Sequence, residues 1–202
     1  MNRLPWLLPS LLALSAPLHD ARGASAEALQ ALAPDAQPEV IALALEARRC
    51  ASVAGVAPAS ERLAVIDYSL PSTRPRLWVF DLAGPSLLYE EHVAHGRGSG
   101  ADLAREFSNI EGSHQSSLGL FLTADTYHGG NGYSLRLDGL EPGTNDRARE
   151  RYIVMHGAPY VDPVAALAQG RLGRSLGCPA VRNAVARELI DVLKEGQLLF
   201  AY

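Results

Sequence analysis

Short apolar runs, separated by clusters of turn-forming residues, dominate the chain from Arg62 onward. Runs of this length between glycine and proline clusters are typical of β-strands. They predict strands at 63–69, 76–82, 87–94, 118–123, 133–137 and 152–155, with a last strand at 198–202. The fold class is therefore expected to be mainly β (α+β).

Two stretches show helical spacing instead. Residues 26–54 are rich in alanine and leucine, and Pro34 and Pro38 divide them into one or two predicted helices. Residues 183–194 repeat apolar positions every three or four residues, with Asn183 as a candidate N-cap. We expect the first stretch to pack outside the sheet as a helical leader.

The beginning of the chain resembles an export signal. Met1-Asn2-Arg3 is basic, residues 4–18 are mostly apolar, and Ala24-Ser25-Ala26 offers small residues for cleavage. This order predicts a signal peptide at 1–26, with an uncleaved membrane anchor as the alternative. Its apolar run is shorter than the roughly 20 residues of a transmembrane helix, so no membrane-spanning segment is expected after signal removal. The remainder divides into a leader at 27–60 and one domain at 61–202.

Charge and cysteine content limit which partners the protein is expected to bind and whether it forms a disulfide. The formal net charge of −4 argues against a nucleic-acid partner, which usually meets a concentrated basic surface. An exported chain with two cysteines, Cys50 and Cys178, can form a disulfide. However, Cys50 follows Leu43 and Ala47 at helical spacing and is predicted to be a small core residue. Cys178 is predicted to be a free thiol.

Cys178 is the candidate nucleophile and His156 its candidate base. In such a pair the imidazole accepts the thiol proton, the sulfur attacks an acyl carbon, and the ring later protonates the leaving group. Pro179 disfavours a helical conformation at Cys178, which predicts a turn there. The helix predicted to follow would place its positive N-terminal end near the sulfur.

Several runs resemble the murein L,D-transpeptidase (YkuD-like) catalytic domains. The resemblance covers about residues 63–202 and is carried by Val-Met-His-Gly-Ala at 154–158 and the run ending Ser-Leu-Gly-Cys-Pro-Ala-Val at 175–181. Further similar runs lie at 65–69, 94–100 and 113–119. The motif roles of the family fall on His156, Gly157, Ser175, Gly177 and Cys178.

The resemblance implies a YkuD-like β-sandwich catalytic domain with a few peripheral helices. It also implies acyl transfer from a peptidoglycan stem tetrapeptide through a Cys178 thioester, resolved by an amine to a 3→3 cross-link or by water. A backbone carbonyl is expected to orient His156, and Gly177, Ser175 and Gly157 are expected to form the oxyanion site or turn. No metal or cofactor is expected, and the site of action is the periplasm or cell envelope.

Four residues are candidate substrate contacts. The family often has a histidine where this chain has Leu176, and usually an arginine at the position of Ala180. Arg174 or Arg182 is therefore predicted to supply the positive charge. His114 and Ser116 are predicted to line the cleft, although histidines in these runs, including His95, equally suit hydrogen bonds to loop backbone. The charged run 147–151 is predicted to be a solvated loop.

Other functions stay open at this point. A carboxypeptidase or another wall cysteine peptidase uses the same thiol chemistry, and an inactive peptidoglycan-binding module needs none. His156 precedes Cys178, whereas an NlpC/P60-type or other cysteine peptidase is expected to have the cysteine first, so the order favours the transpeptidase. The oligomeric state is left open.

Overall fold

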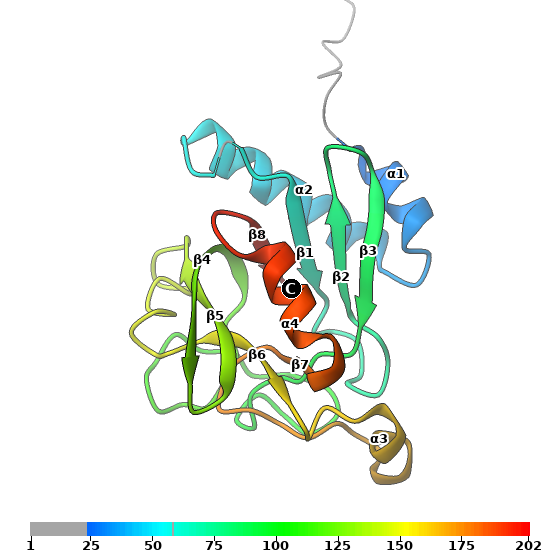
Figure 1. Cartoon of the computed structure of the whole chain (residues 1–202), viewed down its shortest axis with the longest axis vertical. Coiled ribbons are helices and arrows are strands. Elements are labelled where there is room, and N and C mark those ends of the chain that lie inside the picture. Colours follow the sequence, from blue (N-terminus) through cyan, green and yellow to red (C-terminus); the bar gives the residue numbers. More distant parts are fainter. Residues whose placement is uncertain (1–23, 58) are drawn as a thin grey trace, which may run out of the picture.

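The computed structural model describes residues 24–57 and 59–202 (Figure 1). The predicted signal peptide lies outside the described residues except for its last three. Within them the mainly β fold class is confirmed, with a sheet and four helices. The strands are β1 (Arg62–Ile66), β2 (Leu77–Asp81), β3 (Ser86–Glu91), β4 (Gly119–Gly129), β5 (Gly132–Gly139), β6 (Val154–Ala158), β7 (Ala180–Arg182) and β8 (Leu198–Ala201). The helices are α1 (Ala26–Leu32), α2 (Pro38–Val53), α3 (Pro163–Gln169) and α4 (Asn183–Leu193).

The eight strands form one hydrogen-bonded sheet in the order β3-β2-β1-β8-β4-β5-β6-β7. The pairs β1·β8 and β6·β7 are parallel, and the other neighbours are antiparallel. β8, from the end of the sequence, lies in the middle and joins the β1–β3 half to the β4–β7 half. β7 forms the edge of the sheet beyond β6.

Helices cover both faces of the sheet (Figure 1). In β1 the side chains alternate, because successive residues of a strand point to opposite faces. Leu63 and Val65 join the core beneath α1 and α2, whereas Ala64 and Ile66 join the core beneath α4. The predicted leader therefore packs directly on the sheet and completes one of its two cores.

The leader contains the two predicted helices, but its buried face differs from the prediction. α2 begins at Pro38, where a missing N–H costs no helical hydrogen bond. Its buried residues are Val40, Ile41, Ala44 and Ala51. Cys50 lies off this face and is exposed, so its prediction as a core residue is wrong. Because α2 carries alanine on several sides, the pattern of apolar residues did not distinguish its buried face from the face that carries Cys50.

At the other end of the leader, α1 begins inside the predicted signal peptide. Ser25 caps α1, and its hydroxyl accepts a hydrogen bond from the N–H of Ala28. Ala24 and Ala26 pack against the core beneath the leader. The predicted boundary at residue 26 therefore falls within an element of the fold.

Near the candidate site, two short elements differ from the prediction. β7 and α3 have no counterpart among the predicted elements, and α4 begins at Asn183 without a side-chain cap, so the predicted N-cap is wrong. β6 begins at Val154, later than the predicted residue 152, because Tyr152 has a left-handed φ of 55°. Among the described residues, no helix is both long and apolar enough to cross a membrane.

Candidate active site

The Cys178 thiol lies against the start of β6. Its Sγ accepts a hydrogen bond from the N–H of Val154 and donates one to the carbonyl oxygen of Tyr152, both at 3.5 Å. The residue is 8% exposed, and it is a free cysteine, as is Cys50. No disulfide joins Cys50 and Cys178 in this structure, and the free thiol of the active protein stays a prediction.

His156 lies on the neighbouring strand. In the parallel β6·β7 pair His156 is opposite Ala180, so Cys178, two residues earlier, falls near Val154 on the same face. The Nδ1 of His156 is 2.9 Å from the carbonyl oxygen of Gly157. Because a carbonyl oxygen only accepts, Nδ1 carries the proton and the neutral ring keeps a free lone pair on Nε2. A backbone carbonyl therefore orients the ring, as the resemblance implied.

Burial shifts the pKa values of both residues in the direction that favours the neutral form. It lowers the pKa of the His156 imidazole, against the smaller opposing effect of the bond to Gly157. Burial also raises the pKa of the Cys178 thiol, opposed by the Val154 N–H and by the positive charge of Arg151. Desolvation disfavours each charged form. The thiol and the neutral imidazole are therefore the favoured forms.

Ser175 and Gly177 shape the turn that carries the thiol. The Ser175 hydroxyl donates to the carbonyl oxygen of Cys178 at 2.6 Å and accepts from the N–H of Gly177 at 3.1 Å. Gly177 has a φ of 127°, which a side chain would strain. β7 follows this turn, and α4 begins only at Asn183, so the predicted helix N-terminus beside the sulfur is wrong.

Three segments that carry the family resemblance, at 94–100, 113–119 and 175–181, contact one another at this turn. The Ser116 hydroxyl accepts from the N–H of Gly96 at 3.0 Å and donates to the carbonyl oxygen of Gly177 at 3.1 Å. A Cβ on Gly96 would lie 2.9 Å from the Cα of Gly177. Ser116 is buried, so its bonds favour support of the turn over the predicted substrate contact.

The two histidines of these runs have different environments. His114 is half-buried, and its Nδ1 accepts from Nε and Nη2 of Arg97 at 3.2 and 2.9 Å. His95 is fully buried, with Nδ1 2.7 Å from a nitrogen of Arg76 and Nε2 3.4 Å from the carbonyl oxygen of Gly100. His114 stays a candidate cleft residue, whereas His95 supports the loop.

The two predicted arginines also differ. Arg182 forms a bidentate ion pair with Glu91 at 2.8 and 2.5 Å, which occupies its charge. Arg174 donates to the carbonyl oxygen of Gly100 at 2.8 Å, a neutral partner that leaves its charge uncompensated. The geometry therefore favours Arg174 as the substrate contact.

Arg151 is the functional candidate that sequence reasoning missed. It was predicted to be in a solvated loop, but it is half-buried and its charge reaches the thiol. Among the described residues its guanidinium donates to neutral oxygens alone, namely the carbonyls of Ser108 and Gln115 and the hydroxyls of Ser113 and Ser117. The sequence signal that could have indicated Arg151 is its position shortly before β6, the strand that carries His156.

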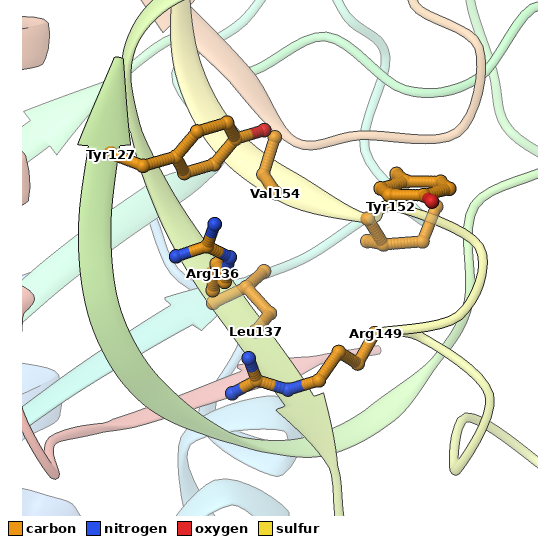
Figure 2. A pocket seen from close by; sticks show the side chains of 7 residues that line it. Tyr127, Arg136, Leu137, Arg149, Tyr152 and Val154 are labelled. Atoms are coloured by element: carbon orange, nitrogen blue, oxygen red, sulfur yellow. The ribbon is translucent and has the colours of Figure 1, made fainter. Parts of the chain in front are cut away.

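Figure 2 shows a pocket whose lining includes Tyr152 and Val154. It has a volume of about 150 Å³ and is lined by Tyr127, Arg136, Leu137, Arg149, Tyr152, Ile153 and Val154. The backbone of Tyr152 and Val154 contacts the Cys178 sulfur, so one segment borders both the pocket and the thiol.

Three bacterial proteins are among the solved structures to which this chain is similar. An L,D-transpeptidase from Mycobacterium smegmatis has a TM-score of 0.42 and 15% identity, covering 71% of this chain and 59% of that one. The helical cell shape determining protein Pgp2 from Campylobacter jejuni has a TM-score of 0.48 and 13% identity, with 69% and 46% covered. An L,D-transpeptidase from Xylanimonas cellulosilytica has a TM-score of 0.40 and 16% identity, with 71% and 61% covered. The matched region spans less than two thirds of each of these structures.

No curated protein matches the chain by sequence. The family model of the L,D-transpeptidase catalytic domain, in contrast, matches residues 32–202, which include both strands of the candidate site and most of the leader. On this match, the chain belongs to the L,D-transpeptidase catalytic domain family.

Proposed function

We propose that the protein is a cysteine-dependent L,D-transpeptidase, with Cys178 as nucleophile and His156 as base. The observation that carries the proposal is the hydrogen bond from Nδ1 of His156 to the carbonyl oxygen of Gly157, at 2.9 Å. It leaves the basic Nε2 available on the face of β6 that the Cys178 turn also borders.

The reaction proceeds in two balanced steps. In the first, Nε2 of His156 takes the Cys178 proton, and sulfur attacks the carbonyl of the third stem residue. The C–S bond forms, the C–N bond to the terminal D-Ala breaks, and the imidazolium protonates the leaving amine. In the second, an acceptor amine attacks the thioester, its proton passes through His156 to the departing sulfur, and the thiol is restored.

An oxyanion develops in both steps and needs backbone donors. Because the Gly177 N–H already donates to Ser175, the N–H of Cys178 is the remaining donor of that pair. The donor substrate is a peptidoglycan stem tetrapeptide, and the address is the cell envelope, reached through the signal sequence proposed at 1–26. Water in place of the amine gives the alternative, an L,D-carboxypeptidase.

Intact mass after incubation with a carbapenem tests the nucleophile. We expect one covalent adduct on the native protein and none on Cys178→Ala. His156→Gln should slow acylation by about 10²-fold or more, because general base catalysis contributes that much. An adduct that persists in Cys178→Ala contradicts the assignment. Muropeptide products then distinguish 3→3 dimers, expected for a transpeptidase, from tripeptides alone, expected for a carboxypeptidase.

A further inference from the structure

Three residues that line the pocket in Figure 2 lie on the same face of the sheet as His156, namely Tyr127, Arg136 and Val154. Arg136 of β5 is directly opposite Val154, and Ser134 is opposite His156. Tyr127 of β4 is opposite Ser134. Directly opposed residues share a face, so Tyr127 and Arg136 lie on the same face as the His156 side chain. A molecule bound in the pocket is therefore at the side of the proposed nucleophile and base.

Two guanidinium groups are held in place around this pocket. Arg136 pairs with Asp125 and lies 4.2 Å from the centre of the Tyr127 ring. Arg149 pairs with Asp138, and its Nη1 is 4.0 Å from Asp125. These pairs are partly exposed, and each arginine has five N–H donors, so donors remain for a ligand. Exposed ion pairs of this kind are weak, so a ligand carboxylate competes with them readily.

The remaining walls are apolar and aromatic. Leu137, Ile153 and Val154 form the apolar part, and Tyr152 borders the pocket with a side chain that is 79% exposed. Cavities on the order of 150 Å³ hold a group about the size of benzene. The chemistry therefore fits a short aliphatic group that ends in a carboxylate.

We infer that this pocket binds the free carboxylate on the diamino-acid side chain of a peptidoglycan stem peptide. The inference rests on the proposed function for the identity of the peptide. Bidentate pairing of a guanidinium with a carboxylate is geometrically favoured, and the aliphatic side chain packs on the tyrosine rings. The carboxylate belongs either to the donor stem or to the acceptor stem, and both place their reacting group near Cys178.

Calorimetric binding to the Cys178→Ala protein tests the pocket without turnover. The probe is a stem tetrapeptide with diaminopimelic acid at the third position, beside the same peptide with the side-chain carboxylate amidated. Arg136→Gln and Arg149→Gln should each weaken binding of the free acid about tenfold, the scale of a lost charge-assisted hydrogen bond, and leave the amide unaffected. Asp125→Asn should tighten binding of the free acid, since it removes a competitor for both arginines.

Arg187→Gln is the matched control, because Arg187 also covers an aromatic ring, that of Tyr133, on the face of the sheet that α4 covers. Equal binding of the free acid by Arg136→Gln, Arg149→Gln and Arg187→Gln overturns the inference. Equal binding of acid and amide by the Cys178→Ala protein overturns it as well. Thermal melts ensure that each variant is folded.

Turnover by the enzyme with Cys178 intact then locates the carboxylate. Slower release of D-Ala by Arg136→Gln assigns it to the donor stem, and a lower fraction of dimers at an equal rate of D-Ala release assigns it to the acceptor stem. If the native protein releases no D-Ala while binding stays dependent on the arginines, the pocket inference stands and the proposed reaction fails.

Discussion

At the scale of single residues, Arg151 shows how a charge can act without an ion pair. Its guanidinium donates to neutral oxygens, and its Nε is buried without a partner among the described residues. A half-buried charge without a carboxylate partner acts more strongly on its neighbours than an exposed charge, because less water screens it. The nearby Cys178 thiol receives that field, so Arg151 favours the thiolate that burial disfavours.

Replacing Arg151 should therefore raise the pKa of Cys178. We expect Arg151→Gln to slow alkylation of Cys178 by iodoacetamide at pH 8 by about tenfold, which corresponds to a shift of about one pKa unit. Arg151→Lys should retain most of the rate because it retains the charge. Arg147→Gln is the control, since Arg147 pairs with the exposed Glu150. An unchanged pH profile of alkylation in Arg151→Gln would count against the electrostatic role.

Buried His95 makes stability depend on pH. Burial and the charge of Arg76 lower its pKa to about 4, from about 6.5 in the unfolded chain. Between these values the unfolded state binds more protons, so stability falls as the pH is lowered from about 6.5 towards 4. The loss is on the order of 3 kcal/mol if the full shift applies.

Urea unfolding at pH 7.5 and pH 5 measures this loss. The native protein should lose stability at the lower pH, and His95→Asn, which keeps an acceptor for Arg76, should lose less. His156 and His92 also have lowered pKa values and account for a remaining slope. An equal slope in His95→Asn would assign the pH dependence to other groups.

At the scale of elements, the strands that could be predicted are those formed by a run of apolar residues. β1, β2 and β8 are buried runs, and the pattern predicted each within a few residues. β7 has three residues and is extended because it pairs with β6, a long-range cause that no local pattern contains. α3 has seven residues, and its Asp162 cap and Gly170 end are recognisable signals in the sequence.

In the candidate site, likewise, residues in local motifs could be predicted and residues defined by long-range contacts could not. Cys178, His156 and the serine turn follow from local motifs. Arg151 was not predictable, because its partners come from residues 108–117. The ion pair of Arg182 could not be predicted from the sequence either. Its partner Glu91 lies on β3, at the opposite end of the strand order from β7.

The contact between β6 and α4 gives a prediction at this scale. A Cβ on Gly157 would lie 2.7 Å from Oδ1 of Asn183 and 2.8 Å from the Cβ of Ala186. Gly157→Ala should therefore separate α4 from β6 at a cost of about 1–3 kcal/mol, measured by urea unfolding, and slow acylation because the Gly157 carbonyl orients His156. Gly84→Ala is the control, because nothing lies within 4 Å of its Cβ position. Equal stability of the two variants would show that the contact relaxes without cost.

At the scale of the whole molecule, the leader and the sheet share one hydrophobic core. The core beneath α1 and α2 includes Trp78 and Phe80 of β2 and Leu198 of β8, all fully buried. β8 joins the two halves of the sheet, so the leader covers the strand on which the β4–β7 half depends. The family match, which begins at residue 32, likewise includes α2. We therefore expect the leader and the sheet to unfold as one cooperative unit, although the sequence pattern changes at the predicted boundary at residue 61.

A matched pair of substitutions in α2 tests this unity. Ile41 is fully buried against the sheet, whereas Leu43, two residues later, is 41% exposed. Ile41→Ala should lower the free energy of unfolding by about 2–5 kcal/mol, and Leu43→Ala by less than about 1 kcal/mol. In a protein of residues 24–202 the single tryptophan is Trp78, so its fluorescence reports unfolding of the sheet. A cooperative unit shifts the Trp78 transition in Ile41→Ala, because losing contacts in the helix destabilises the strands beneath it. If that transition stays in place while helical circular dichroism is lost earlier, the leader unfolds separately and the sheet is stable without it.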